Sequence, residues 1–223
     1  MKKIYQFAVI LVLFCNNGTL EAQKTSSHLL PVKGIFGIYD YQFEYYSKVR
    51  KVLFNGLTDK PEIRFQVMPS FTPESVLDIE RDGGKCYLIY HICDKMIWNN
   101  TSWEEVEVIK FKSEIDSESV RLIKSLFEIA TAQVRYPERI INPDGLEAIT
   151  VRVDGENYYF STYINDGHGV RAGTVWSPKK GSKMEKLVMI GNKLIELAKS
   201  EKERVTFDTE LKKSIENLIE ELK

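Results

Sequence analysis

The segment from Asn165 to Ser182 gathers the residue types that could do chemistry. His168 and Asp166 can transfer protons near neutral pH. The four glycines of the segment would let the backbone approach a ligand closely. Three basic side chains and a helix-initiating serine could together hold an anion: Arg171, Lys179, Lys180 and Ser182. This segment is therefore the first candidate for a catalytic or ligand-binding site.

The spacing of these residues matches neither the phosphate-binding glycine loop nor the dinucleotide fingerprint. Both of those motifs link a strand directly to a helix. Residues Asn165 to Gly181 instead have the composition of a long polar loop. We therefore favour a mobile surface loop whose charges face water, with an anion site as the alternative hypothesis.

His91 is a second catalytic candidate. Alternation along a strand places it on the same face as Asp78 and Glu80, so a His and carboxylate pair could form if that face lined a cleft. The competing interpretation is a histidine that is hydrogen-bonded on a solvated sheet face. Cys93 shares that face, but about 7 Å between neighbouring same-face side chains is too far for direct proton transfer.

No motif specific to a reaction is present elsewhere in the chain. The nucleophile elbow Gly-x-Ser-x-Gly is absent, and no pair of Cys or His residues stands at metal-ligand spacing. We therefore expect no metal and no cofactor. Whether the protein is an enzyme stays uncertain, with a non-catalytic role favoured.

Cys86 and Cys93 flank a run that is typical of a strand. Seven steps of about 3.3 Å place their Cα atoms roughly 23 Å apart, far beyond the limit of about 7 Å for a disulfide. We therefore predict two free thiols that act as small apolar side chains.

The N-terminus predicts export. Two lysines precede a run from Ile4 to Cys15 that is apolar apart from Gln6, which is the pattern of a signal peptide, and we place the cut after Ala22. The run is shorter than the roughly 20 residues of a membrane span. Residues 1–22 are thus a predicted signal peptide, and the mature protein is expected in the periplasm or outside the cell. The alternative is a lipid anchor on Cys15, although Phe14 is large for the position before a lipidated cysteine.

The charge of the chain is nearly balanced, with a net charge of −1. Such balance argues against nucleic acid or an anionic membrane surface as a partner. Because the chain has a predicted export signal and no catalytic motif, we expect the mature protein to bind another protein or a polymer of the cell envelope without catalysis. The alternative is a small exported hydrolase that uses a His and carboxylate pair.

Hydrophobic spacing predicts a single α+β domain over residues 23–223. Helical periodicity, alternation and turn residues place the elements as follows: a helix over 39–53, a strand over 63–67, a hairpin of 76–81 with 86–93, a strand from 106, a helix over 117–134, a hairpin of 147–153 with 157–164 around Asp154-Gly155, and helices from 182 and 208. Short links between strands favour antiparallel pairing. The expected fold is one mainly antiparallel sheet with helices on one face and a C-terminal helical pair, in which the last helix docks on the domain.

The first predicted helix is rich in aromatic residues: Tyr39, Tyr41, Phe43, Tyr45 and Tyr46. We expect these side chains to pack against the sheet, with a partner-binding face as the alternative.

Overall fold

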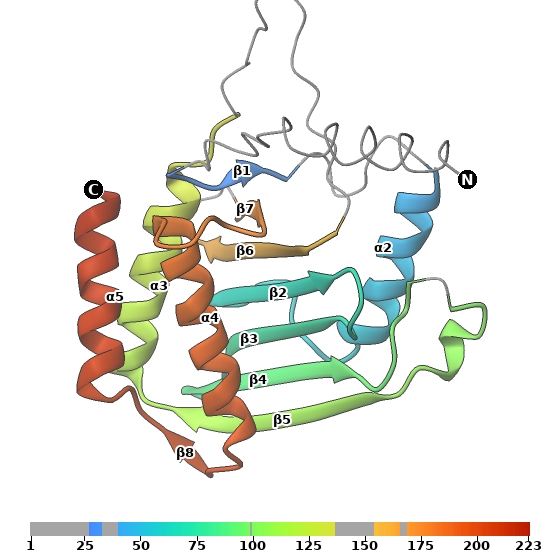
Figure 1. Ribbon diagram of the computed structural model, residues 1–223. Coiled ribbons are helices and arrows are strands. Elements are labelled where there is room, and N and C mark those ends of the chain that lie inside the picture. The colour runs from blue at the N-terminus through green and yellow to red at the C-terminus, as the bar shows by residue number, and fades with distance from the viewer. Residues whose placement is uncertain (1–26, 33–39, 99, 137–153, 166–168) are drawn as a thin grey trace, which may run out of the picture.

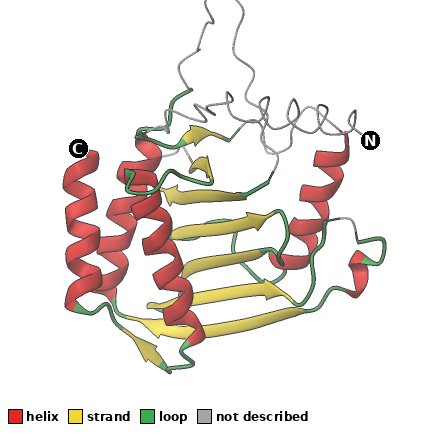
Figure 2. Ribbon diagram, in the orientation of Figure 1, coloured by secondary structure: helices red, strands yellow, loops and turns green. Residues whose placement is uncertain are grey.

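Eight strands form one sheet in the computed structural model, which describes residues 27–32, 40–98, 100–136, 154–165 and 169–223. The strands are β1 (Leu30–Pro31), β2 (Ile63–Pro69), β3 (Ser75–Asp82), β4 (Lys85–Cys93), β5 (Val108–Ile115), β6 (Glu156–Ile164), β7 (Gly169–Trp176) and β8 (Arg204–Val205). Their order across the sheet is β1-β7-β6-β2-β3-β4-β5-β8. Neighbours are antiparallel except β5 and β8, which confirms a mainly antiparallel α+β fold (Figures 1 and 2). The predicted signal peptide, with Cys15, lies outside the described residues.

Three helices cover one face of the sheet. They are α3 (Ser117–Ala132), α4 (Lys183–Lys199) and α5 (Thr209–Leu222), and they bury the main core against Phe65, Leu77 and Leu88. In Figure 1, α4 crosses in front of the central strands while α3 and α5 stand at one end. The C-terminal helix docks on this layer through one apolar side, as predicted, with Leu211, Ile215 and Leu218 buried.

Helix α2 (Asp40–Leu53) lies on the other face of the sheet. Its residues Val49 and Leu53 join a second, smaller core with Met68, Val76 and Cys93. Because Val76 and Leu77 are consecutive in β3, their side chains point to opposite faces. Among the described residues, the sheet therefore has a layer of three helices on one side and α2 over one end of its strands on the other.

Local signals account for the helix starts. The side chain of Asp116 accepts hydrogen bonds from two backbone N–H groups at the start of α3, and that of Asp208 accepts one, from Leu211, at the start of α5. The turn between β3 and β4 contains Gly83 and Gly84, both with positive φ, as the predicted hairpin requires.

The predicted hairpin around Asp154-Gly155 is wrong. Strand β6 pairs with β2 on one side and with β7 on the other, along nearly its whole length. Both hydrogen-bonding edges of β6 are thus occupied by described strands. Residues 147–153, the other arm of the predicted hairpin, lie outside the described part of the chain.

The predicted long loop from Asn165 to Gly181 is also wrong, because Gly169–Trp176 forms β7. Glycine lowers strand propensity, and it hid this strand in the sequence. Gly173 is needed for packing: a Cβ placed there would lie 2.6 Å from Val134 Cγ2 and 2.7 Å from Leu29 Cβ. The glycine allows residues 29–31 and the end of α3 to close over β7.

Candidate functional site

The basic residues of the predicted anion site lie in β7 and in the segment that follows it. Arg171 lies near the start of β7, and the strand advances about 16 Å from there to its end. Lys179 and Lys180 follow that end and are exposed. Asp166 and His168, the proposed proton-transfer residues, lie outside the described residues.

Ser182 caps α4, as the sequence predicts. Its hydroxyl accepts a hydrogen bond from the N–H of Glu185 at 3.1 Å, and the carboxylate of Glu185 accepts one from the N–H of Gly181. A carboxylate of the protein therefore already lies at the helix end where the hypothesis placed a bound anion. The role of Ser182 in the described structure is that of a helix cap.

His91 is buried, with 4% of its surface exposed, so the expectation of a solvated sheet face is wrong at this position. Its Nδ1–H donates to the backbone carbonyl of Leu53 at the end of α2, at 2.7 Å. Burial lowers the pKa of His91, an effect that the bond to Leu53 opposes and the nearby charge of Lys110 reinforces. The imidazole is therefore neutral at pH 7 and anchors the last turn of α2 to the sheet.

Asp78 is fully buried and is held by Arg64. Nε and Nη2 of Arg64 donate to the two carboxylate oxygens at 2.8 and 2.6 Å. Nη2 also donates to the carbonyl of Thr58, and the ring of Phe54 lies 4.3 Å from the guanidinium carbon. Burial raises the pKa of Asp78 to about 6, because the loss of hydration outweighs the two bonds from Arg64.

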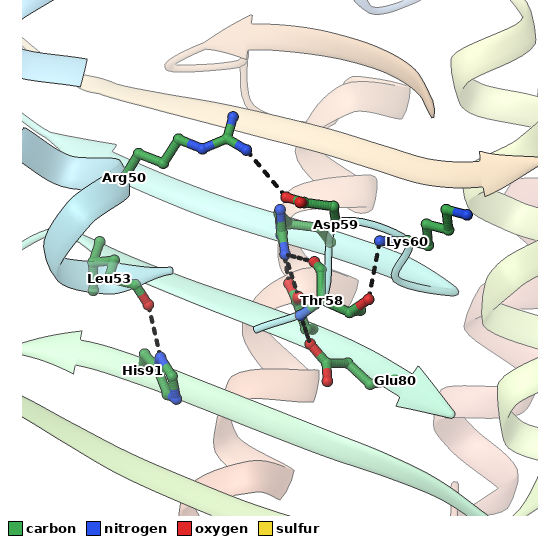
Figure 3. A network of polar contacts seen from close by, with 9 residues as sticks. Arg50, Leu53, Thr58, Asp59, Lys60, Glu80 and His91 are labelled. Atoms are coloured by element: carbon green, nitrogen blue, oxygen red, sulfur yellow. Dashed lines mark hydrogen bonds and ion pairs between the residues drawn. The ribbon is translucent and has the colours of Figure 1, made fainter. Parts of the chain in front are cut away.

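Glu80 has a separate partner, since its carboxylate accepts the backbone N–H of Thr58 at 2.6 Å. Figure 3 shows Glu80 directed at the Thr58 segment and His91 directed at Leu53. In the described structure neither Asp78 nor Glu80 is hydrogen-bonded to His91. These contacts hold α2 and the loop of residues 54–62 on the sheet.

An open groove of about 460 Å³ lies between α2 and β5. It is lined by Lys51 and Val52 at the end of α2, by Asn55 in the loop that follows, by Trp103 and Glu104 of the short helix η1 (Trp103–Glu105) with Val106 after it, and by Val108 and Lys110 of β5. We call it the α2–β5 groove. Valine side chains and one indole ring supply its apolar surface. The amines of Lys51 and Lys110 supply positive charge, and the carboxylate of Glu104 supplies negative charge.

Trp103 is flanked by two cations in this groove. The amines of Lys48 and Lys51 lie 5.8 and 5.6 Å from its ring centroid. The amine of Lys110 donates to the carbonyl of Asn55 at 3.2 Å, across the groove. Our sequence reading missed this site; its only local signal is the spacing of Lys48 and Lys51, which puts both on one side of α2.

The aromatic residues of α2 that the structure describes pack as expected. The hydroxyl of Tyr45 donates to the buried carboxylate of Glu74 at 2.8 Å, and that carboxylate also accepts the backbone N–H groups of Ile97 and Trp98. The hydroxyls of Tyr46 and Tyr159 lie 2.6 Å apart. These contacts join α2 to the sheet. The side chains of Tyr39, Tyr41 and Phe43 lie outside the description.

A second groove, of about 390 Å³, lies at the start of β2. Its lining residues are Lys60, Pro61, Glu62, Lys124, Tyr163 and Asn165. The carboxylate of Glu62 is already bonded to Lys124 and Arg81, so the main charges of this groove compensate each other.

No protein-family model, curated protein or solved structure matches this chain. Within the described ranges, no helix is both long and apolar enough to cross a membrane. The same ranges contain no cluster of three His, Cys, Asp or Glu side chains arranged to hold a metal ion.

Proposed function

We propose that this protein is a non-catalytic binding protein that acts after export, and that the α2–β5 groove is its binding surface. Its partner is another protein or a polymer of the cell envelope. The observation that carries the proposal is Trp103, half-buried beside the amines of Lys48 and Lys51. A tryptophan ring on an apolar floor is typical of the residues that dominate binding energy at interfaces.

The hydrolase alternative receives less support. His91 donates to a backbone carbonyl, Asp78 is bonded to Arg64, and Glu80 accepts from Thr58. A general base must reach both a substrate proton and an orienting group. Each of these three groups instead contributes to holding α2 and the following loop. A hydrolase using Asp166 and His168 would draw on residues outside the described structure.

A pull-down with matched charge variants tests the proposal. Mature protein is immobilised and presented with the proteins and polymers of its own exported compartment. Lys48→Glu with Lys51→Glu should abolish capture of the recovered partner. Lys179→Glu with Lys180→Glu makes the same change of charge at the end of β7, where both lysines are exposed, and should leave capture unchanged.

Loss of capture only in the Lys179 and Lys180 double variant would place the binding site at the basic residues predicted from the sequence. Equal capture by both double variants would reject the groove. Trp103→Ala is a further variant that keeps all charges and should weaken capture at least tenfold, because a central aromatic side chain at an interface is often worth 2 kcal/mol or more, roughly thirtyfold.

A further inference from the structure

Strand β5 has an open hydrogen-bonding edge next to the α2–β5 groove. On its outer side β8 pairs only with Glu114 and Ile115. Figure 1 shows β8 beside one end of β5, while the rest of β5 continues past it towards η1. In the part of the chain that the structure describes, residues 108–113 pair on their inner side alone, with β4.

The hydrogen bonds of the ladder identify which backbone groups face outwards. The N–H of Asp94 donates to the carbonyl of Glu107, so in this antiparallel register Ile109 and Phe111 also direct their N–H and C=O groups towards β4. The alternate residues direct theirs to the outer edge. Glu114 confirms this parity, since its N–H donates to the carbonyl of Glu203 on the outer side.

Three residues therefore present unpaired backbone groups along the outer edge: Val108, Lys110 and Lys112. None of the described residues supplies a partner for these N–H and C=O groups. Such an edge is a template for an added strand. A strand bound there would place every second side chain on the same face as these three residues, which is the face of the groove.

The charges along this edge select the partner. Neither Lys110 nor Lys112 is paired with a carboxylate in the described chain; Lys110 donates to the carbonyl of Asn55, and Lys112 lies 4.1 Å from the ring centroid of Tyr87. Directly opposed side chains of neighbouring strands have Cβ atoms about 5 Å apart, where opposite charges attract and like charges repel. The lysines therefore disfavour pairing of two β5 edges and favour an acidic strand.

We infer that the partner at the α2–β5 groove is an extended acidic polypeptide segment that adds to β5 as a further strand. Its backbone pairs with Val108, Lys110 and Lys112, and its acidic side chains lie opposite the two lysines. Its remaining same-face side chains reach the apolar floor formed by Val106, Val108 and Trp103. This inference rests on the proposed function and names the class of ligand for the same groove.

The probe is a short synthetic peptide in which threonine occupies every second position and the positions between read Glu, Glu and Val, so that the acidic and apolar side chains share one face of the added strand. Its binding to the mature protein is measured by fluorescence anisotropy. Lys112→Pro is compared with Lys112→Ala: both lose the amine, but only proline removes the outward N–H. That N–H makes no bond to β4, so the ladder is kept and proline is tolerated at such an edge. The proline variant should bind about tenfold more weakly than the alanine variant, because one backbone hydrogen bond is lost and the peptide carbonyl is left unpaired.

A second measurement avoids any change to the protein. N-methyl groups on alternate amides of the peptide block either the N–H groups that face β5 or those that face away from it. Only methylation of the N–H groups that face β5 should abolish binding. This comparison decides the question if the proline variant does not fold, which its melting temperature would reveal.

Several results would overturn the inference. Equal binding by Lys112→Pro and Lys112→Ala, or by both methylated peptides, would exclude strand addition. In that case, loss of binding in the Lys48 and Lys51 double variant would still support the groove as the binding surface. Absence of binding by the peptide, or equal binding of the same peptide with Lys in place of Glu, would exclude an acidic strand. A concentration-dependent dimer that Lys112→Pro disrupts would assign the edge to a second copy of this chain.

Discussion

Arg64 and Asp78 form a two-bond ion pair on neighbouring strands, directly across from each other in the β2–β3 register. The carboxylate has no exposed surface, and the guanidinium reaches from the pair to the carbonyl of Thr58. The pair therefore connects the sheet to the loop that follows α2, and it helps to position the helix that forms one wall of the groove.

Loss of one partner of this pair should be strongly destabilising. Arg64→Leu leaves the Asp78 carboxylate buried without its donor, and the free energy of unfolding should fall by about 3–5 kcal/mol in urea denaturation. Arg64→Met combined with Asp78→Leu removes both charges and should recover most of the loss. A single variant as stable as the wild type would show that the ion pair does not form.

His91 should make stability depend on pH. Its folded-state pKa lies below the value of about 6.5 for an unfolded histidine, so below that pH the unfolded chain binds a proton that the folded protein does not. Stability contributed by neutral His91 is therefore present above about pH 6.5 and is lost as the pH falls towards the folded pKa.

The check is urea unfolding at pH 5 and pH 7.5 for the wild type and His91→Gln. The wild type should lose more stability at pH 5 than the variant does. Asp78, whose pKa is raised to about 6, acts with the opposite sign: its contribution to stability declines as the pH rises from about 4 to 6. It is present in both proteins, so the comparison cancels it. An identical loss in both proteins would contradict the predicted role of His91.

Gly191 should not tolerate alanine, although alanine is the better helix former. A Cβ at this position of α4 would lie 2.6 Å from Cε1 of Phe65, in the middle of the main core. Overpacking typically costs about 1–3 kcal/mol, more than the gain of about 1 kcal/mol in helix propensity. Thermal unfolding of Gly191→Ala should show a lowered Tm. Asn192→Ala, at the exposed neighbouring position, should not, and Phe65→Leu should partly rescue the glycine variant.

Cys86 and Cys93 should be free and slow to react. Both are buried and unbridged, which confirms the prediction from their spacing, and burial raises the pKa of Cys93 to about 12. A protein expressed without residues 1–22, unfolded and unreduced, should titrate as two thiols, whereas the same protein when folded at pH 8 should react slowly because the thiolate is scarce. Rapid labelling of the folded protein, or no thiols after unfolding, would be inconsistent with this arrangement.

The sequence by itself determined the elements whose signals are local. Asp116, Ser182 and Asp208 each start a helix because a side-chain oxygen meets N–H groups two or three residues further on. The two glycines between β3 and β4 specify that hairpin by the same short-range logic. These interactions are complete within a few residues, so the pattern of residue types is sufficient to predict them.

Only the tertiary structure decided which strands become neighbours and which edge stays open. Gly173 suppressed the local signal of β7, yet the strand forms because it pairs with β6 and β1. The glycine leaves room for Leu29 and Val134, which are distant in the sequence. The signal at Asp154-Gly155 was equally local, and it failed because β2 and β7 occupy both sides of β6. The groove also depends on contacts between distant segments, because Lys51 and Trp103 meet only where α2 is anchored on the face that carries His91 and Asp78. Such contacts produce no periodic pattern in the sequence.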